Sequence, residues 1–171
     1  EEAPIHGLVN NAAGNFISRT QDLSHRGFDA IASIVFHGTF YVTHSIGRRW
    51  LELGMGGNII SILATWVWTG SAFTVPSAMS KSGIHAMTQS LATEWGKTGI
   101  RINAIAPGPF PTEGAWARLS PDQDPNADAS AASGTYSQNP MGQVGEMEEL
   151  GNLATFLMSD GCNYLNGQTI A

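Results

Sequence analysis

Ser77 and Lys81 are the two side chains in this sequence whose types and spacing best suit chemistry. They stand four residues apart in a segment of helical periodicity, so both lie on one face of the expected helix, beside a loop that carries Trp66. A lysine in such a place can donate hydrogen bonds to ligand hydroxyls and can stabilise a negative charge that develops nearby. Ser-x-x-x-Lys is common by itself, and the alternative is a lysine on the exposed face of an amphipathic helix.

The elements that must position this pair alternate between strands and helices. Short apolar runs predict buried strands, and longer periodic segments predict helices. The expected strands are residues 6–10, 58–62, 99–106 and 167–171, and the expected helices are residues 24–53, 77–96 and 146–159. This alternation indicates βαβ units in an α/β fold with a parallel sheet, whose ligands sit beyond the carboxyl ends of the strands.

Local signals refine these boundaries. Ser24 suits an N-cap, and Gly38 interrupts the first helix without ending it. Residues 54–57 (GMGG) break the chain before the second strand, and residues 63–76 form an apolar loop. One buried stripe on the helix at residues 77–96 consists of Ile84, Met87, Leu91 and Trp95.

One segment departs from this alternating pattern. Residues 121–134 are rich in Asp, Ala and Ser and have no periodicity, which predicts a mobile loop within a substrate lid around residues 112–140. The whole chain, residues 1–171, is therefore expected to form part of one domain that carries this lid.

The composition argues against several classes of function. The net charge is −6 and the basic residues form no cluster, so nucleic-acid binding is not expected. No run of 18 apolar residues predicts a transmembrane helix, and the five histidines show no metal-ligand spacing. Cys162 is the single cysteine, which excludes an internal disulfide and argues against secretion. We therefore expect a cytoplasmic or organellar protein without a metal.

Several motifs together resemble the short-chain dehydrogenase/reductase superfamily. Residues 8–14 (LVNNAAG) and 101–108 (RINAIAPG) match its motifs, and Lys81 matches the lysine of its Tyr-x-x-x-Lys pair. Ser77 stands in place of that tyrosine, and Ala64, thirteen residues earlier, in place of the catalytic serine. Within the superfamily the chain resembles the 2,4-dienoyl-CoA reductases. That likeness rests on residues 10–16 (NNAAGNF), 75–78 (VPSA), 94–97 (EWGK), 107–109 (PGP), 114–119 (GAWARL) and 148–150 (EEL).

The resemblance implies a Rossmann-like doubly wound sheet and a reductase that moves a hydride from NADPH to a dienoyl thioester of coenzyme A. The hydride adds to the far end of the diene, and negative charge gathers on the thioester oxygen, which then needs hydrogen-bond donors. No carbonyl becomes an alcohol, so the loss of the usual tyrosine is tolerated. In such reductases the asparagine that matches Asn15 holds the thioester oxygen, and the equivalents of Ser77 and Lys81 orient water and cofactor.

The same resemblance implies roles for further residues, each beside a plainer alternative. Trp66 takes the place of a tyrosine in the mitochondrial-type reductases and either donates its N–H to the substrate or packs. Asn15 by itself suits an ordinary loop, and Ser24 caps a helix without any ligand. The expected cofactor contacts are Lys81, Asn11, Ala12, Pro107, Gly108, Pro109, Phe110 and Thr112. The expected substrate contacts are Phe16, Ser24 and Arg118, where Phe16 could instead fill the core and Arg118 could be a surface charge.

The glycine-rich phosphate loop of this superfamily is not among the 171 residues. In the family it precedes the strand that begins here near His6, so we expect a C-terminal part of the fold without its first βαβ half, or a truncated relative. These residues alone are then expected to be inactive, and the flank of the first strand would be an unpaired edge. Family members assemble through the two long helices, which implies a homo-oligomer, most simply a tetramer. The alternatives are a short-chain dehydrogenase of other specificity and a non-catalytic oligomerising relative.

Overall fold

The computed structural model describes residues 4–110 and 141–171, and its strands and helices alternate as expected from the sequence. The strands are β1 (Gly7–Asn10), β2 (Gly57–Ile62), β3 (Ile100–Ile105) and β4 (Thr169–Ile170). The α-helices are α1 (His25–Ala32), α2 (Gly38–Leu53), α3 (Trp66–Thr69), α4 (Val75–Trp95) and α7 (Met147–Met158), with 3-10 turns at Thr20–Asp22, Gly96–Thr98 and Asp160–Cys162. The described strands pair in parallel in the order β1-β2-β3-β4, which confirms the parallel α/β sheet.

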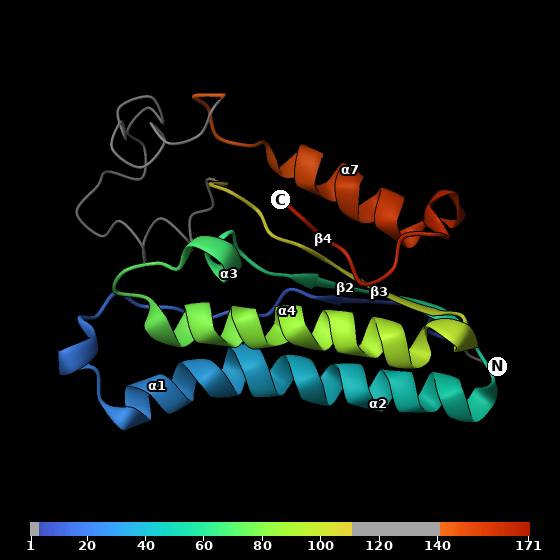
Figure 1. The fold of residues 1–171 in the computed structure, drawn as a ribbon, viewed down its shortest axis with the longest axis horizontal. Helices are drawn as coiled ribbons and strands as arrows, with labels where there is room; N and C mark the ends of the chain where they lie inside the picture. The colour runs from blue at the N-terminus through green and yellow to red at the C-terminus, as the bar shows by residue number, and fades with distance from the viewer. Residues whose placement is uncertain (1–3, 111–140) are drawn as a thin grey trace.

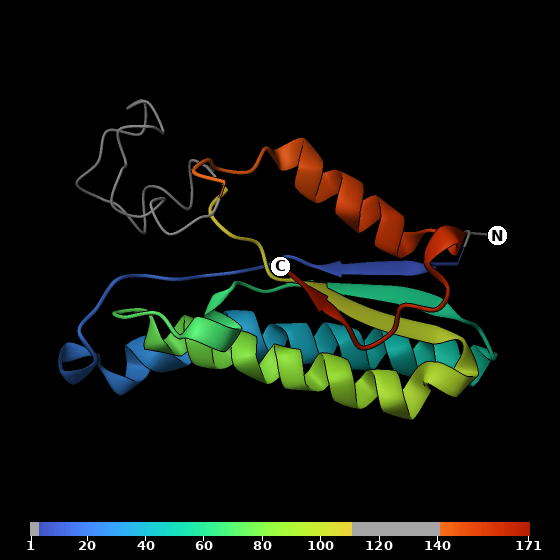
Figure 2. The same cartoon turned by 45° about the horizontal axis from the view of Figure 1, so that its top comes forward.

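The sheet lies between two layers of helices. Helices α2 and α4 run side by side along one face, and α7 covers the other (Figures 1 and 2). Two apolar clusters, around Ile84 and around Trp50, fill the space on the α2/α4 side, and a third, around Leu157, lies under α7. Because β3 has helices on both faces, all six of its residues are buried.

The long helical segment expected at residues 24–53 is present with one local change. The Ser24 hydroxyl accepts a hydrogen bond from the Gly27 N–H (3.0 Å), and Gly54 ends α2 with a φ of 63°. Between α1 and α2, residues Ser33–His37 form a π-helical turn in which the Gly38 N–H bonds to the Ser33 carbonyl. The helix therefore continues through Gly38, as predicted, but with a turn that its apolar periodicity does not reveal.

Two sequence expectations were wrong in detail. Residues 63–76 are not all loop, because Trp66–Thr69 forms the short helix α3 and α4 begins at Val75. Pro76 lies in the first turn of α4, where its missing N–H costs no hydrogen bond. The first strand is also less buried than predicted. Val9 is 49% exposed because β1 is an edge strand among the described residues.

Polar side chains of β3 hold the chain between α7 and β4. The buried Arg101 guanidinium donates to the carbonyls of Leu157 (3.0 Å), Ser159 (3.1 Å) and Leu165 (3.3 Å). Asn103 donates to the Leu165 carbonyl (2.9 Å). These donors satisfy carbonyl groups in the last turn of α7 and in the segment that leads from α7 to β4, which ties that segment to the sheet.

Helices α2 and α4 approach closely at Gly47, and this contact gives a stability prediction. A Cβ added to Gly47 would lie 2.3 Å from the Trp95 ring, which is itself buried between helix and sheet. We expect Gly47→Ala to lower the free energy of unfolding by about 1–3 kcal/mol in a urea titration. Gly151 on α7 is the matched control, because its Cβ would meet no atom within 4 Å. Gly151→Ala should raise stability by about 1 kcal/mol, and equal midpoints for the two variants would contradict the proposed clash.

Candidate functional site

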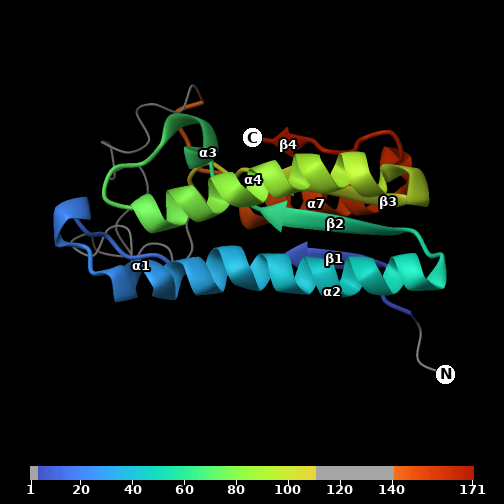
Figure 3. The same cartoon turned by 60° about the horizontal axis from the view of Figure 1, so that its bottom comes forward.

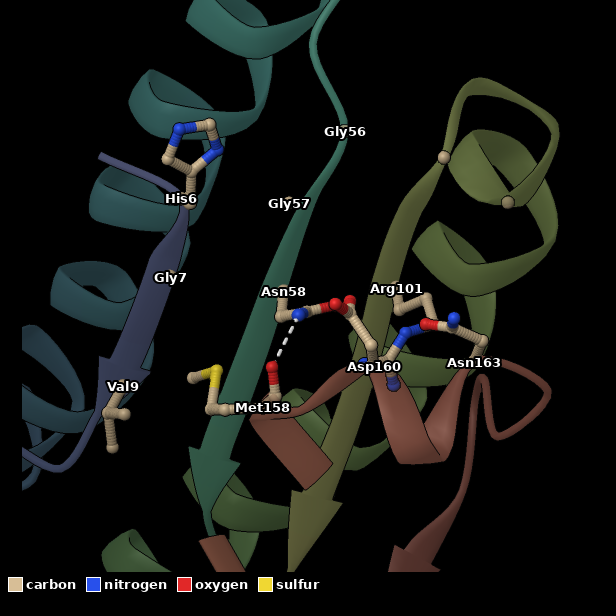
Figure 4. Close-up of a pocket in the computed structure, with 12 residues that line it drawn as sticks. His6, Gly7, Val9, Gly56, Gly57, Asn58, Arg101, Met158, Asp160 and Asn163 are labelled. Atoms are coloured by element: carbon tan, nitrogen blue, oxygen red, sulfur yellow. Dashed lines mark hydrogen bonds between the residues drawn. The ribbon is translucent and has the colours of Figure 1, made fainter. Parts of the chain in front are cut away.

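A hollow of about 860 Å³ lies at the amino ends of the strands, and none of the expected catalytic, cofactor or substrate residues lines it. It is lined by His6 and Gly57 at the starts of β1 and β2 and by Asn58, whose side chain donates to the Met158 carbonyl at 2.9 Å (Figure 4). Ligands of parallel α/β sheets bind at the opposite edge, beyond the carboxyl ends of the strands. We therefore place the candidate site at that opposite edge.

Lys81 reaches this edge from α4. Its side chain is buried, with 6% exposure, and its ammonium group donates to the carbonyl of Ile62, the last residue of β2. Burial away from water lowers the pKa of Lys81 from 10.5 to about 8. Among the described residues no carboxylate forms an ion pair with it. The exposed surface lysine considered above is thus excluded, and the charge remains available to a ligand.

Ser77 lies one helical turn before Lys81 on the same buried face of α4, as the spacing predicted. It is 3% exposed. The nearby Ser80 hydroxyl is already used, because it donates to the Pro76 carbonyl at 2.7 Å. The described part of the chain offers the Ser77 hydroxyl no such partner, which leaves it able to bond a water or a ligand.

Asn15 lies in the loop after β1 and carries an unused donor. Its Oδ1 accepts a hydrogen bond from the Phe16 N–H (3.0 Å), which fixes the orientation of the amide. Its Nδ2 is buried, and no described residue accepts a hydrogen bond from it. An unpaired buried N–H is costly, so this amide is arranged to meet an acceptor that the described residues do not supply.

The loop between β2 and α4 carries the two departures from the usual catalytic residues. Ala64 precedes α3, and its carbonyl accepts a hydrogen bond from the Val67 N–H (3.2 Å). Trp66 opens α3 and is half-buried. The helix is held against α4 by Val67, which packs on the cluster around Ile84. Because no described hydrogen bond involves the Trp66 indole, its role as donor or packing residue stays a prediction.

The expected cofactor contacts follow the ends of β1 and β3. Asn11 and Ala12 come directly after β1 and are exposed. After β3, the Phe110 ring lies so close to Gly145 that an added Cβ there would be 2.4 Å from it. The Gly145 N–H also donates to the Pro109 carbonyl (3.2 Å). Pro107 and Gly108 complete this segment, and a Cβ on Gly108 would meet nothing within 4 Å, which leaves its backbone approachable.

The expected substrate contacts are only partly described. Phe16 is 37% exposed, and its ring lies 3.3 Å from where a Cβ on Gly27 would be, against the start of α1. Ser24 uses its hydroxyl to cap that helix, as the plainer alternative proposed. Thr112, Arg118 and the expected lid at 112–140 lie outside the described residues.

The comparisons with known proteins decide the family. The family described as Enoyl-(Acyl carrier protein) reductase, a short-chain dehydrogenase group, matches residues 2–171. A Caenorhabditis elegans protein named as a probable 2,4-dienoyl-CoA reductase is 47% identical over 163 residues, which cover 95% of this chain and 52% of that protein. The chain belongs to the short-chain dehydrogenase/reductase family.

Other members of the family are also similar to this chain over part of their length. A Bacillus subtilis protein named as a probable 2,4-dienoyl-CoA reductase is 40% identical over 97% of this chain and 63% of its own length. A solved structure from Beutenbergia cavernae, named as an NAD(P)-dependent gluconate 5-dehydrogenase with bound NADP, superposes with a TM-score of 0.89 at 27% identity, over 99% of this chain and 65% of that one. The chain thus spans about half to two thirds of the length of these relatives, and its Rossmann-like fold is shared with them.

Sequence reasoning gave no role to one residue that supports the candidate site. Asn10, the last residue of β1, donates through Nδ2 to the hydroxyls of Thr43 on α2 (2.9 Å) and Ser61 on β2 (3.4 Å). It therefore fixes the carboxyl end of β1, from which Asn11 and Ala12 continue. The paired asparagines at 10–11 were visible in the sequence, but the partner Thr43 is 33 residues away and could not be read from it.

No group of three His, Cys, Asp or Glu side chains among the described residues could hold a metal, and no described helix is long and apolar enough to cross a membrane.

Proposed function

We propose that this chain belongs to a reductase that transfers a hydride from NADPH to a 2,4-dienoyl-CoA thioester, in an auxiliary step of fatty acid oxidation. The observation that carries the proposal is the buried Nδ2 of Asn15, which has no hydrogen-bond partner among the described residues. A hydride acceptor of this kind develops negative charge on a thioester oxygen, and a preorganised N–H donor is what stabilises it. The names of the C. elegans and B. subtilis relatives support the same substrate class.

The residues divide the work as follows. NADPH supplies the hydride. The Asn15 amide donates to the thioester oxygen, and Lys81, charged below its pKa of about 8, favours the anion through its field and binds cofactor hydroxyls. Ser77 positions a water that returns a proton to carbon. Neither Ser77 nor Ala64 can act as the tyrosine acid does, and this reaction needs no such acid because no alcohol forms.

The residues at this edge fit a nicotinamide cofactor. The buried Lys81 ammonium, which has no carboxylate partner in the described part of the chain, suits ribose hydroxyls, and the approachable backbone at Gly108 suits a carboxamide. The 171 residues contain no glycine-rich phosphate loop, so we propose that the complete protein supplies one and that this chain alone does not turn over. NADPH rather than NADH is also a proposal, supported by the NADP in the B. cavernae structure.

The test is NADPH oxidation by the full-length protein with a 2,4-dienoyl-CoA and, in parallel, with a 3-ketoacyl-CoA of equal chain length. We expect turnover of the dienoyl substrate alone. Turnover of the ketoacyl substrate alone would favour the second candidate, a short-chain dehydrogenase of other specificity. Trp66 is the observation behind that candidate, because it stands where the mitochondrial-type reductases place a tyrosine at the thioester oxygen and would suit a different hydride acceptor. Turnover of neither, with intact assembly, would indicate a non-catalytic relative.

We also propose that the protein assembles as a homo-oligomer, most simply a tetramer, through α2 and α4. These helices lie next to each other (Figure 3), and residues 30–47 and 82–93 contain no Asp, Glu, Lys or Arg. Phe40, Tyr41 and Val42 on α2 are each 45% exposed or more. Because this apolar face carries no charged side chains, its desolvation costs little free energy, and it suits association with a second copy.

Light scattering after size exclusion tests this assembly. We expect a multiple of the chain mass for the wild type and a smaller species for Phe40→Glu, because an added charge on the α2 face must be desolvated on association. Phe156→Glu on α7, where the phenylalanine is similarly exposed (47%), is the control and should leave the mass unchanged. A wild type that elutes only as a monomer would contradict the proposal.

The compartment, cytoplasmic or organellar, stays a prediction.

A further inference from the structure

Phe73 is held in a backbone conformation that its own side chain disfavours. Its φ is 64°, and it is the one non-glycine residue with a positive φ among the described residues. Glycine or asparagine adopts this left-handed region with little strain, whereas a residue with a large side chain adopts it at a cost. A strained residue persists only when its surroundings hold it there, and such residues cluster at functional sites.

The surroundings that hold Phe73 are those of the candidate site. Its carbonyl accepts a hydrogen bond from the Ser18 N–H (2.9 Å), which ties the start of α4 to the loop after β1. Ser77 follows four residues later on α4, and Asn15 lies three residues before Ser18. The strained residue therefore joins the two segments that carry the proposed oxyanion donor and the proposed water-binding hydroxyl.

Core packing does not account for the phenylalanine side chain. The residue is 53% exposed and belongs to none of the core clusters formed by the described residues, so much of it is open to solvent. Phe16 and Ile17, on the segment bonded to it through Ser18, are also exposed, by 37% and 47%. These three apolar residues lie on the segments that carry Asn15 and Ser77, residues 12–18 and 63–80, which contain no Asp, Glu, Lys, Arg or His. An uncharged, apolar border suits a hydrocarbon chain better than a sugar or a phosphate.

We infer that Phe73, with Phe16 and Ile17, binds the hydrocarbon tail of the acyl substrate, and that its left-handed backbone presents the ring to that tail. This inference rests on the proposed function and names the part of the substrate that these residues contact. Because the tail is distant from the reacting carbons, its contact should lower KM without changing kcat, as expected of binding that is equal in the ground and transition states.

The test compares Phe73→Asn with the wild type on 2,4-hexadienoyl-CoA and 2,4-decadienoyl-CoA, in the full-length protein. Asparagine tolerates the left-handed conformation, so the melting temperature should be no lower than that of the wild type. We expect KM for the ten-carbon substrate to rise about tenfold with unchanged kcat, and KM for the six-carbon substrate to change less. Phe73→Tyr should restore the wild-type values. Phe156→Ala removes an exposed ring on the opposite face of the sheet and should leave both KM values unchanged.

A second readout separates this inference from the proposed reaction. Binding of saturated decanoyl-CoA, measured by calorimetry, needs no turnover and should weaken about tenfold in Phe73→Asn. If the wild type fails to reduce any dienoyl-CoA but this loss of decanoyl-CoA affinity is seen, the proposed function is wrong and the acyl-binding role stands. If Phe73→Asn lowers the melting temperature and leaves the dependence on chain length intact, the ring packs against the protein itself and the inference is overturned.

Discussion

Replacing Lys81 with methionine is expected to lower turnover of the full-length protein by at least a hundredfold and, at pH 7, to stabilise the fold. Both effects follow from one buried ammonium group whose only described partner is the Ile62 carbonyl. Methionine keeps the length and apolar stem of the side chain but removes the charge that favours the developing anion. It also removes the cost of burying that charge, which is the reason that its pKa falls to about 8.

The pH dependence gives this prediction its sign. Below about pH 8 Lys81 is charged in both the folded and unfolded states, so the folded protein bears the full cost of burial. Between about pH 8 and 10.5 the unfolded chain binds more protons than the folded one, and stability therefore rises with pH. The pKa of Lys81 falls from 10.5 in the unfolded chain to about 8 in the folded protein. At 1.36 kcal/mol per pKa unit, the free energy of unfolding therefore rises by at most on the order of 3 kcal/mol across this pH range.

Urea unfolding from pH 7 to 10.5 checks the stability effect. The wild type should gain stability relative to Lys81→Met across this range, and the exposed Lys97→Met should show no such difference from the wild type. Turnover should fall as pH rises through about 8, because Lys81 loses the charge it uses. A Lys81→Met variant that is less stable than the wild type at pH 7 would mean that the lysine is a structural anchor.

Replacing Asn15 with alanine is expected to lower kcat by about 10²–10³-fold while the free energy of unfolding stays within roughly 0.5 kcal/mol of the wild type. The Nδ2 donor has no described partner to lose, so its removal leaves no broken contact in the fold. The one bond lost, from the Phe16 N–H to Oδ1, lies in an exposed loop where water can replace the acceptor.

Asn10 is the matched control for this prediction. The same substitution there removes the bonds to Thr43 and Ser61, so Asn10→Ala should cost about 1–3 kcal/mol of stability. Thermal unfolding and single-turnover NADPH oxidation, measured on both variants, separate the two roles. If Asn15→Ala lost as much stability as Asn10→Ala and kept the wild-type kcat, Asn15 would be an ordinary loop residue.

Elements with a strong local signal were readable before the structure was known. Ser24 as a helix cap, Gly54 at a helix end and the strand at residues 58–62 depend on a few neighbouring residues, and all three are confirmed, with the strand starting one residue earlier. The helix α3 and the π turn at Ser33–His37 were not predicted. Helix α3 is a single turn, which is too short for a periodic signal. The π turn inserts a residue without disturbing the apolar pattern on either side, so it leaves no periodic signal either.

The sequence by itself determined the parallel α/β fold, the alignment of Ser77 with Lys81 and the family, because periodicity and ordered motifs are local properties of a chain. Only the tertiary structure decided that Lys81 is buried, that Phe73 is strained, and that the residues at 4–110 and 141–171 supply neither a carboxylate to Lys81 nor an acceptor to the Asn15 amide. Burial, hydrogen-bond satisfaction and backbone strain depend on what distant segments bring alongside a residue. Ser18 meets Phe73, and β2 meets Lys81, through packing that no local pattern records.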